Sequence, residues 1–119
     1  MSISALQLLL ADFADRRDWG PFHTPKNLAM ALTGEAGELA AEFQWLEPGE
    51  SERVMDDPAK ARAVRLEMAD VFSYLLRLAD VLDVDLEAAL REKVAINEGR
   101  FPAAGPAGDV VGTDGPAGR

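Results

Sequence analysis

Two of the carboxylate pairs spaced three residues apart lie in or beside the apolar stripe of a predicted helix, and this spacing places both members of a pair on one side of the helix. The pairs are Glu35 with Glu38 and Glu67 with Asp70. Four carboxylates gathered between facing helices would repel one another unless a divalent cation neutralised them. An all-oxygen ligand set suits Mg²⁺, with Mn²⁺ as a substitute, and a metal-loaded cluster would attract phosphate.

The helical periodicity around the first pair argues against the alternative, an ordinary solvated surface pair. Glu35 falls inside an apolar stripe, while Glu38 and Glu42 lie along its edge. The stripe consists of Leu28, Leu32, Leu39, Phe43 and Leu46. An unpaired buried carboxylate costs roughly several kcal/mol or takes up a proton. No basic residue stands three or four positions from Glu35 or Glu38, so local salt bridges do not explain them.

The second pair repeats this arrangement on a later helix. Glu67, Asp70 and Tyr74 form a band beside an apolar face made of Val64, Met68, Val71, Leu75, Leu78 and Leu82. Glycines 34 and 37 lie inside the helix that carries Glu35 and Glu38, and each costs about 1 kcal/mol relative to alanine. They indicate either that something approaches the backbone there or that two helices pack closely.

Complementary charge and flat aromatic surface occur elsewhere in the chain. Lys93, Asn97 and Arg100 share one helix face and could hold phosphate oxygens, although a solvated face is the plainer interpretation. Aromatic surface in or near loops comes from Trp19, His23 and Trp45. Such rings suit base stacking beside an acidic cleft, although an indole more often fills a core or an interface.

Helix signals account for most of the chain. The first predicted helix opens with a capping box from Ser4 to Gln7 and ends near Arg16 or Arg17. The second begins at Thr24-Pro25 and runs to about Leu46. A polar loop is expected over residues 50–57, and a third helix follows Asp57-Pro58 to about residue 82. The fourth covers about residues 86–98, with Gly99 just beyond its end.

These elements predict an all-α fold, a bundle of four or five helices with short connections. Residues 1–101 would form one domain. Residues 102–119 are rich in proline and glycine and are predicted to be a disordered tail. About one hundred ordered residues bury a modest core, so a homo-oligomer is favoured.

Composition excludes several classes of function. The 119 residues carry a net charge of −9, which disfavours nucleic-acid polymers and anionic membranes as partners. The absence of cysteine removes disulfides, thiolate metal sites and cysteine nucleophiles, and the single histidine excludes sites needing two imidazoles. No segment is apolar enough to span a membrane, and the N-terminal stretch, interrupted by Asp12, is not typical of a secretion signal. A cytoplasmic location is therefore expected.

The carboxylate pairs also carry a family resemblance. Glu35-Ala36-Gly37-Glu38 followed by Glu67-Met68-Ala69-Asp70 resembles the ExxE…ExxD signature of the MazG-like all-α nucleotide pyrophosphohydrolases. Within that superfamily the sequence is most similar to the dCTP pyrophosphatases and their bacterial relatives. The likeness spans about residues 5–102 and includes Arg17-Asp18-Trp19, Phe22-His23, Phe43-Gln44-Trp45 and the ending Lys93, Asn97, Arg100 and Phe101.

The resemblance implies Mg²⁺-dependent hydrolysis of a (deoxy)nucleoside triphosphate, dCTP or a modified dCTP, to monophosphate and pyrophosphate, as nucleotide-pool sanitation. It implies that Glu35, Glu38, Glu67 and Asp70 are the catalytic, magnesium-binding residues, with Glu38 a candidate to orient the attacking water. The pocket for the nucleobase would be lined by Trp19, His23, Asn27 and Trp45. Sugar or phosphates would be held by Tyr74, Lys93, Asn97 and Arg100. It also implies a dimer, or a tetramer built as a dimer of dimers.

Three alternatives stay open. The chain could be a nucleotide- or metal-binding helical module without turnover, or a structural helical oligomer whose acids serve solubility. It could also be another hydrolase of the superfamily, acting on dUTP or phosphoribosyl-ATP, although the aromatic residues argue against this. Two departures from the family pattern matter: Phe101 stands where relatives carry tyrosine, and Glu42 is an extra acid that is not transferred as a ligand.

Overall fold

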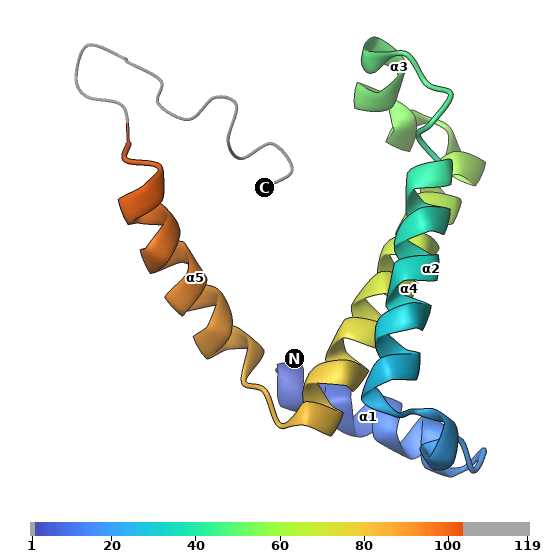
Figure 1. The fold of residues 1–119 in the computed structure, drawn as a ribbon. Coiled ribbons are helices and arrows are strands. Elements are labelled where there is room, and N and C mark those ends of the chain that lie inside the picture. Colours follow the sequence, from blue (N-terminus) through green and yellow to red (C-terminus); the bar gives the residue numbers. More distant parts are fainter. Residues whose placement is uncertain (1, 104–119) are drawn as a thin grey trace. The chain divides into compact units, whose positions relative to one another are not determined.

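A computed structural model describes residues 2–103, and every regular element in that range is helical, which confirms the all-α class (Figure 1). The predicted tail lies outside the described residues from 104 onward. The chain divides into two units, Met1–Asp83 and Val84–Arg119, which are described separately. The first unit holds α1 (Ile3–Asp15), the 3₁₀ turn η1 (Gly20–Phe22), α2 (Pro25–Ala41), α3 (Pro48–Glu52), the 3₁₀ turn η2 (Val54–Asp56) and α4 (Pro58–Leu82). The second holds α5 (Leu86–Arg100).

The first unit is organised around α4. Helix α2 packs along α4, and α1 packs against it as well (Figure 1). The Gln7 side-chain amide of α1 donates a 3.1 Å hydrogen bond to the Leu76 carbonyl oxygen of α4. Little of the unit is fully buried: the core side chains are Ala14, Leu28, Ala61, Val64, Leu76 and Ala79.

Capping residues fix where the long helices begin, largely as the sequence predicts. The Thr24 hydroxyl accepts from the backbone N–H of Asn27, and Asp57 accepts from that of Ala59, each with proline at the first helical position. Helix α4 therefore spans its predicted range. The predicted start of α1 is wrong, because Ser2 and not Ser4 caps it, accepting from the Ala5 N–H at 3.1 Å.

The connection between α2 and α4 differs from its prediction. Helix α2 ends at Ala41 rather than near Leu46, because the backbone N–H of Glu42 already bonds the carbonyl three residues back and turns follow. The expected loop over residues 50–57 is also wrong, since it contains most of α3 and all of η2. Glu47 and Glu50 form a reciprocal capping box around Pro48, which is a helix-start signal that the sequence carries.

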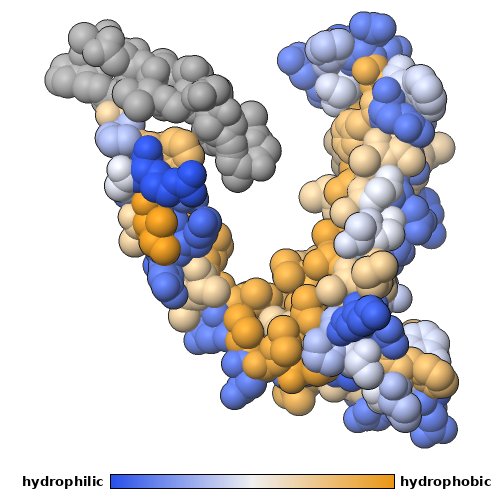
Figure 2. Space-filling model, viewed as in Figure 1, coloured by the Kyte–Doolittle hydropathy of each residue, from blue (hydrophilic) through white to orange (hydrophobic). Residues whose placement is uncertain are grey.

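Apolar side chains remain at the surface of the first unit. On α4 the predicted apolar face is only partly buried: Met68, Leu75 and Leu82 are exposed, because α2 and α1 cover two narrow strips of the helix rather than one broad face. Leu8 and Leu9 of α1 are exposed as well. Figure 2 shows apolar surface gathered at the end of the unit where α1 lies. No helix within residues 2–103 combines the length and apolar character that crossing a bilayer requires.

In the second unit α5 begins as predicted, with the Asp85 carboxylate accepting from the Ala88 N–H at 3.0 Å. Its end differs from the prediction. Gly99 lies inside the helix, which continues to Arg100, and the Phe101 N–H closes it by donating to the Asn97 carbonyl oxygen at 2.7 Å.

Candidate active site

Three glutamates meet where α2 and α4 pack together. Glu35 and Glu38 come from successive turns of α2 and Glu67 from α4, and each offers a carboxylate oxygen within 4.8 Å of the other two. Glu35 and Glu67 are half-buried, whereas Glu38 is exposed. We call these three residues the acid cluster. The structure thus brings together three of the four predicted acidic residues.

The fourth predicted acid, Asp70, lies one turn further along α4, outside this cluster. Its negative charge is nevertheless close enough to raise the pKa of both Glu35 and Glu67. Asp70 is exposed and also lines a neighbouring pocket. It therefore connects the acid cluster to that pocket.

Burial and mutual repulsion both disfavour the charged forms of the cluster. Partial burial raises the pKa of Glu35 above its ordinary value, and the charges of Glu38, Asp70 and Glu67 and a hydrogen bond with Glu38 add to this. Burial likewise raises the pKa of Glu67, followed by the charges of Glu38, Asp70 and Glu42. Each carboxylate would be relieved by a positive counter-charge.

The surroundings do not provide that counter-charge within the described residues. The Glu67 Oε2 atom is buried without a hydrogen-bond partner, and no ion pair in residues 2–103 involves the acid cluster. Glu42, one turn after Glu38, is different, because its Oε1 lies 3.0 Å from Lys60 Nζ. An all-oxygen donor set with an unsatisfied buried oxygen fits a hard divalent cation such as Mg²⁺.

The two glycines beside the cluster are not needed for packing among the described helices of the first unit. A Cβ atom built on Gly34 or Gly37 would meet no described atom within 4 Å. Close packing against another helix of the first unit, one form of the helix-packing interpretation, is therefore not observed among the described residues. The other interpretation stays a prediction: the open space lets a ligand or a second copy approach the backbone next to Glu35 and Glu38.

A pocket of about 270 Å³ lies beside Asp70. Its walls come from α1, the connector after it, and α4, and the lining residues are Leu10, Phe13, Ala14, Trp19, His23, Asp70, Ser73 and Tyr74. We call it the aromatic pocket. It contains three of the residues expected to bind substrate: Trp19, His23 and Tyr74.

The end of α1 determines where Trp19 lies. Asp18 has φ +56°, in the left-handed region, so the chain reverses there. The Trp19 N–H then bonds the Ala14 carbonyl oxygen at 3.0 Å and the Asp18 N–H bonds that of Asp15 at 3.1 Å, the paired bonds of a Schellman motif. This turn sets the Trp19 indole 5.6 Å from the Phe13 ring, edge to face.

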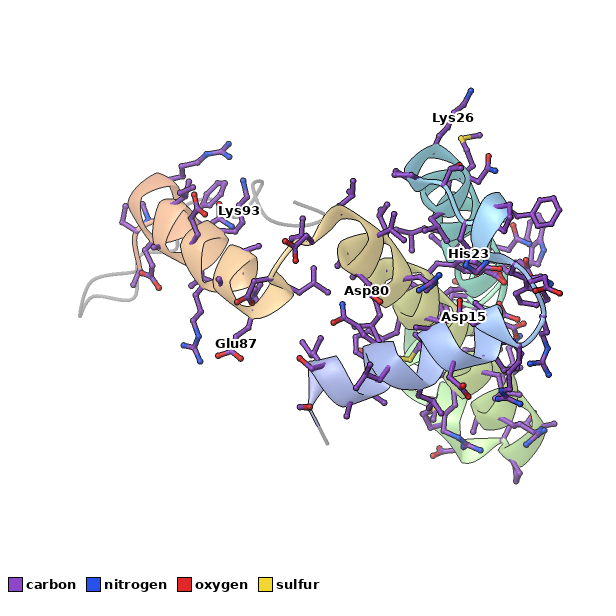
Figure 3. All side chains as sticks on the ribbon, turned by 90° about the horizontal axis from the view of Figure 1, so that it is seen from below. Asp15, His23, Lys26, Asp80, Glu87 and Lys93 are labelled. Atoms are coloured by element: carbon purple, nitrogen blue, oxygen red, sulfur yellow. The ribbon has the colours of Figure 1, made fainter. Side chains whose placement is uncertain are left out.

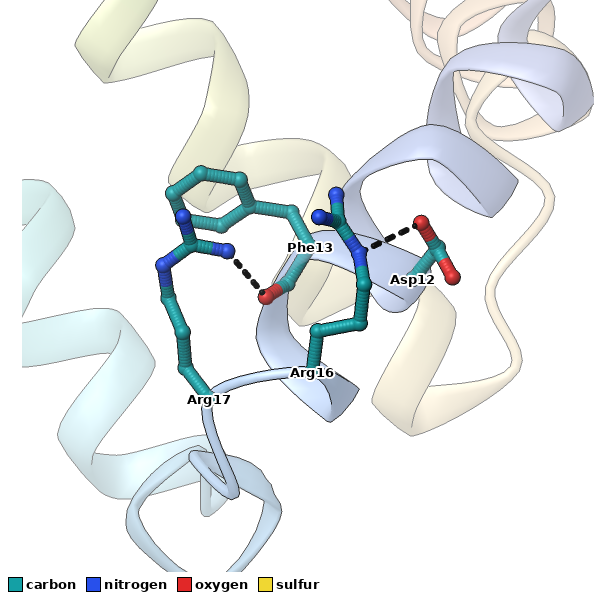
Figure 4. Close-up of polar contacts among 4 residues, drawn as sticks. All are labelled: Asp12, Phe13, Arg16 and Arg17. Carbon is teal, nitrogen blue, oxygen red and sulfur yellow. Dashed lines mark hydrogen bonds and ion pairs between the residues drawn. The ribbon is translucent and has the colours of Figure 1, made fainter.

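Phe13 is held from the other direction by Arg17. The guanidinium carbon lies 3.6 Å from the centre of the Phe13 ring, and Arg17 Nη1 donates to the Phe13 carbonyl oxygen at 3.1 Å (Figure 4). Nearby, Arg16 pairs with Asp12 at 3.0 Å on the exposed side of α1. Stacking and capping by one side chain give the pocket a fixed aromatic wall.

His23 ends η1 and is held by α4. Its Nδ1 atom accepts a 3.1 Å hydrogen bond from Arg77 Nε, and Arg77 Nη1 lies 3.6 Å from Asp80 Oδ2. Partial burial lowers the pKa of His23 below its ordinary value of 6.5, and the positive charge of Arg77 lowers it further. The imidazole ring is 5.8 Å from the Trp19 ring.

Two other expected base-binding residues have different surroundings. The Asn27 side-chain amide donates to the Phe22 carbonyl oxygen at 3.0 Å, so it supports the connector that carries His23. Trp45 lies in the turn after α2 and is 86% exposed, outside the aromatic pocket. The base-binding role of Asn27 and Trp45 stays a prediction.

The predicted phosphate-binding residues lie on α5. Lys93 and Arg100 are exposed, and Asn97 is half-buried. The Arg100 guanidinium lies 5.1 Å from the Phe101 ring centre. Lys93 and Glu87 project from different sides of this helix (Figure 3). The helix belongs to the second unit, so the role of these three residues stays a prediction.

Sequence reasoning missed Arg77 and the pairing of Lys60 with Glu42. Arg77 is three residues after Tyr74 and seven after Asp70, which places it on their side of α4. It also interrupts an apolar run, the same signal that identified Glu35. Applied to basic residues, that criterion would have found it.

Comparison with known proteins gives similar curated sequences and a similar solved structure. The chain is 43% identical to dCTP pyrophosphatase 1 of Homo sapiens over 102 residues, covering 86% of this chain and 60% of that protein. It is 41% identical to dCTP pyrophosphatase 1 of Rattus norvegicus over 101 residues, covering 85% and 59%. The chain thus spans about 60% of the length of these curated relatives.

A crystal structure of a pyrophosphatase from Archaeoglobus fulgidus DSM 4304 is similar in fold and sequence. The TM-score is 0.78 at 37% identity, and the alignment covers 83% of this chain and 91% of the archaeal one. No family model matches the chain.

Proposed function

This chain belongs to the all-α, MazG-like pyrophosphatase family, and we propose that it hydrolyses a (deoxy)nucleoside triphosphate to the monophosphate and pyrophosphate. dCTP or a modified dCTP is the preferred substrate, by analogy with the names of the curated relatives. The reaction would remove such nucleotides from the cellular pool. A cytoplasmic location stays a prediction from the sequence.

The observation that carries this proposal is the junction of two unlike sites at Asp70. On one side lie three carboxylates with an unpaired buried oxygen, and on the other lies a pocket walled by Phe13, Trp19 and Tyr74. A nucleoside triphosphate has the matching halves, a flat base and a chain of phosphates that arrives with divalent cations.

The metal is expected to bind through Glu35, Glu38, Glu67 and Asp70. When bound, Mg²⁺ supplies positive charge to the phosphates and lowers the pKa of a coordinated water. Mn²⁺ would substitute because it accepts the same hard oxygen ligands. Since the pKa values of Glu35 and Glu67 are raised, the cation competes with protons for these carboxylates.

The residues of the chain have distinct tasks in this reaction. Water attacks the α-phosphorus in line, a new P–O bond forms, and the bond to the bridging oxygen of the β-phosphate breaks as pyrophosphate leaves. Glu38, the exposed member of the acid cluster, orients this water and takes its proton. Trp19 and His23 hold the base and Tyr74 the sugar, so that the phosphates extend toward the cluster.

The triphosphate is expected to need positive side chains as well as metal. We assign this task to Lys93, Asn97 and Arg100 of α5, which share one helix face at spacings of four and three residues. Arginine and lysine hold phosphate oxygens by charge-assisted hydrogen bonds, and asparagine can donate to them. Replacing Lys93 or Arg100 by a neutral residue should weaken nucleotide binding more than it changes turnover.

A substrate panel with product identification tests the proposed function. Purified protein is incubated with each deoxynucleoside triphosphate, 5-methyl-dCTP and ATP, with Mg²⁺, with Mn²⁺, or with EDTA. We expect monophosphate and pyrophosphate in equal amounts, fastest with a cytosine nucleotide and absent with EDTA. Release of inorganic phosphate instead of pyrophosphate would contradict the assigned bond. Binding without turnover would favour the helical binding module.

We also propose that the protein acts as a homo-oligomer, a dimer or a tetramer assembled as a dimer of dimers. Six small or apolar side chains are fully buried, whereas large apolar ones are exposed on every long helix. Leu8 of α1 is 71% exposed, Met30 of α2 65%, and Phe72 of α4 45%. So many exposed large apolar side chains on a chain with so small a core favour an interface that would cover part of them. Sedimentation analysis should give a multiple of the 12.8 kDa chain mass, and a monomer at all concentrations would contradict the proposal.

A further inference from the structure

The hydrogen bond between Arg77 and His23 fixes which imidazole nitrogen carries the proton. A guanidinium Nε can only donate, so His23 Nδ1, at 3.1 Å, must be an unprotonated acceptor. The neutral ring then carries its hydrogen on Nε2. A doubly protonated ring would turn an N–H toward a cation, so this contact disfavours the imidazolium form.

Arg77 is itself held in place. Its side chain is 12% exposed, and Asp80, one turn later on α4, lies 3.6 Å from Nη1. The pairing orients the guanidinium toward the connector rather than toward solvent. The order of contacts is therefore Asp80 to Arg77 to His23, running from the surface of α4 into the aromatic pocket.

The other groups around His23 leave Nε2–H as its contribution to a ligand. From α1 the pocket receives the apolar side chains of Leu10, Phe13 and Ala14, and from the connector the Trp19 ring. From α4 it receives Ser73, Tyr74 and the Asp70 carboxylate. The positive charge of Arg77 adds to burial in keeping His23 neutral, because both lower its pKa.

We propose that Arg77 is a positioning residue for base recognition: it holds His23 as a neutral Nε2–H donor, so that the aromatic pocket selects a base offering a hydrogen-bond acceptor to that atom. The proposal rests on the proposed function for the identity of the ligand. Cytosine meets the requirement with two neighbouring acceptors, the ring nitrogen N3 and the carbonyl oxygen O2. Uracil and thymine carry a hydrogen on N3, so at this edge they meet the requirement only through a carbonyl oxygen and lose the ring-nitrogen acceptor.

The experiment reads the imidazole directly and then the kinetics. His23 is the single histidine of the chain, so its ¹⁵N NMR signals are unambiguous in the full-length protein. The variants are Arg77→Met, which removes the donor, and Arg77→Gln, which keeps an amide donor without the charge. Asp80→Asn removes the charged partner of Arg77. The control is Arg62→Met, which changes an exposed arginine of the same helix.

In the unmodified protein we expect the Nε2–H form alone at neutral pH. Arg77→Met should raise the pKa of His23 toward 6.5 and admit the other tautomer, whereas Arg77→Gln should raise the pKa but keep the tautomer. With dCTP, Arg77→Met should raise KM about threefold to tenfold at nearly unchanged kcat, as expected for one hydrogen bond. Arg77→Gln should raise KM much less than Arg77→Met does, and Arg62→Met should change neither KM nor kcat.

A double-mutant comparison separates positioning from general structure. In a His23→Asn background, Arg77→Met should add almost nothing to KM, because the residue through which it acts is gone. Independent, additive effects on KM would overturn the proposal, as would unchanged His23 signals in Arg77→Met. If Arg77→Met does not fold, Arg77→Gln decides by the NMR criterion. If no nucleotide is hydrolysed by the unmodified protein, the proposed function fails, while the NMR result still decides whether Arg77 sets the state of His23.

Discussion

The acid cluster and the aromatic pocket are adjacent on α4 but satisfy their polar groups in opposite ways. In the pocket, His23 accepts from Arg77, Arg77 pairs with Asp80, and the Phe13 ring is stacked by Arg17. In the cluster, the carboxylates raise one another's pKa and one buried oxygen has no partner. The pocket is thus preorganised by the chain itself, whereas the cluster has unsatisfied charge that the proposed cation would neutralise.

The largest expected effect comes from neutralising one member of the acid cluster. Glu38→Gln should leave the helices intact and lower turnover by about two orders of magnitude or more, because it removes a metal ligand and the proposed proton acceptor. Pyrophosphate release measures this, and circular dichroism checks the fold. Glu42→Gln, at the C-cap of the same helix, is the matched control, since Glu42 is already paired with Lys60, and it should keep most of the activity. Full activity in Glu38→Gln would contradict the assignment.

Magnesium should stabilise the protein increasingly as pH rises. The pKa values of Glu35 and Glu67 are raised in the folded state, so their contribution to stability is full below the ordinary value of 4.5 and is lost as pH rises through the raised values. Mg²⁺ replaces the lost protons, and at a hundredfold excess over its Kd it should add about 2.7 kcal/mol to the free energy of unfolding. His23, with a lowered pKa, contributes in the opposite direction, losing stability as pH falls.

Thermal melts with and without Mg²⁺, from pH 4.5 to neutrality at constant ionic strength, measure this effect. Glu67→Gln should flatten the pH dependence and weaken the response to magnesium. An equal response at both ends of the pH range would show that the cation does not displace protons from these carboxylates.

The aromatic pocket should respond to a different change. Trp19→Ala should raise KM for the nucleotide about tenfold, since stacking on one base is worth about 1–3 kcal/mol, while the stabilisation by Mg²⁺ should remain. Trp19→Phe keeps a ring and should recover part of the loss. Trp45→Ala is the informative companion, because Trp45 is exposed in the single chain. An equal rise in KM for Trp45→Ala would place that indole at the substrate in the assembled protein, and loss of the magnesium response in Trp19→Ala would contradict the independence of the two sites.

The smallest expected effect concerns the turn at Asp18, which positions Trp19 in the aromatic pocket. Because Asp18 occupies the left-handed region, Asp18→Gly should raise the free energy of unfolding by about 0.5 kcal/mol, and Asp18→Val should lower it by about 1 kcal/mol. Urea unfolding measures both. Asp18→Val should also raise KM without changing the response to magnesium, and a changed magnesium response would show that the turn supports the cluster as well.

The parts of the molecule that sequence reasoning predicted are those with local signals. Proline after Thr24 or Asp57 fixed the starts of α2 and α4, and a glutamate inside a leucine stripe identified Glu35. The misses depend on contacts between distant segments. Arg77 reaches His23 across 54 positions, and Met68 is exposed because α1 and α2 leave that strip of α4 uncovered. The spacing of residues along one helix predicts neither the contact between Arg77 and His23 nor the exposure of Met68.

The different settings of the two tryptophans give the protein an intrinsic optical reporter. Trp19 lies against His23 inside the aromatic pocket, whereas Trp45 is almost fully hydrated, and the chain has no other indole. In a Trp45→Phe background the whole indole emission would come from Trp19. Quenching of that fluorescence would then follow occupancy of the base pocket in real time, without a label, and would separate binding of the base from binding of the metal.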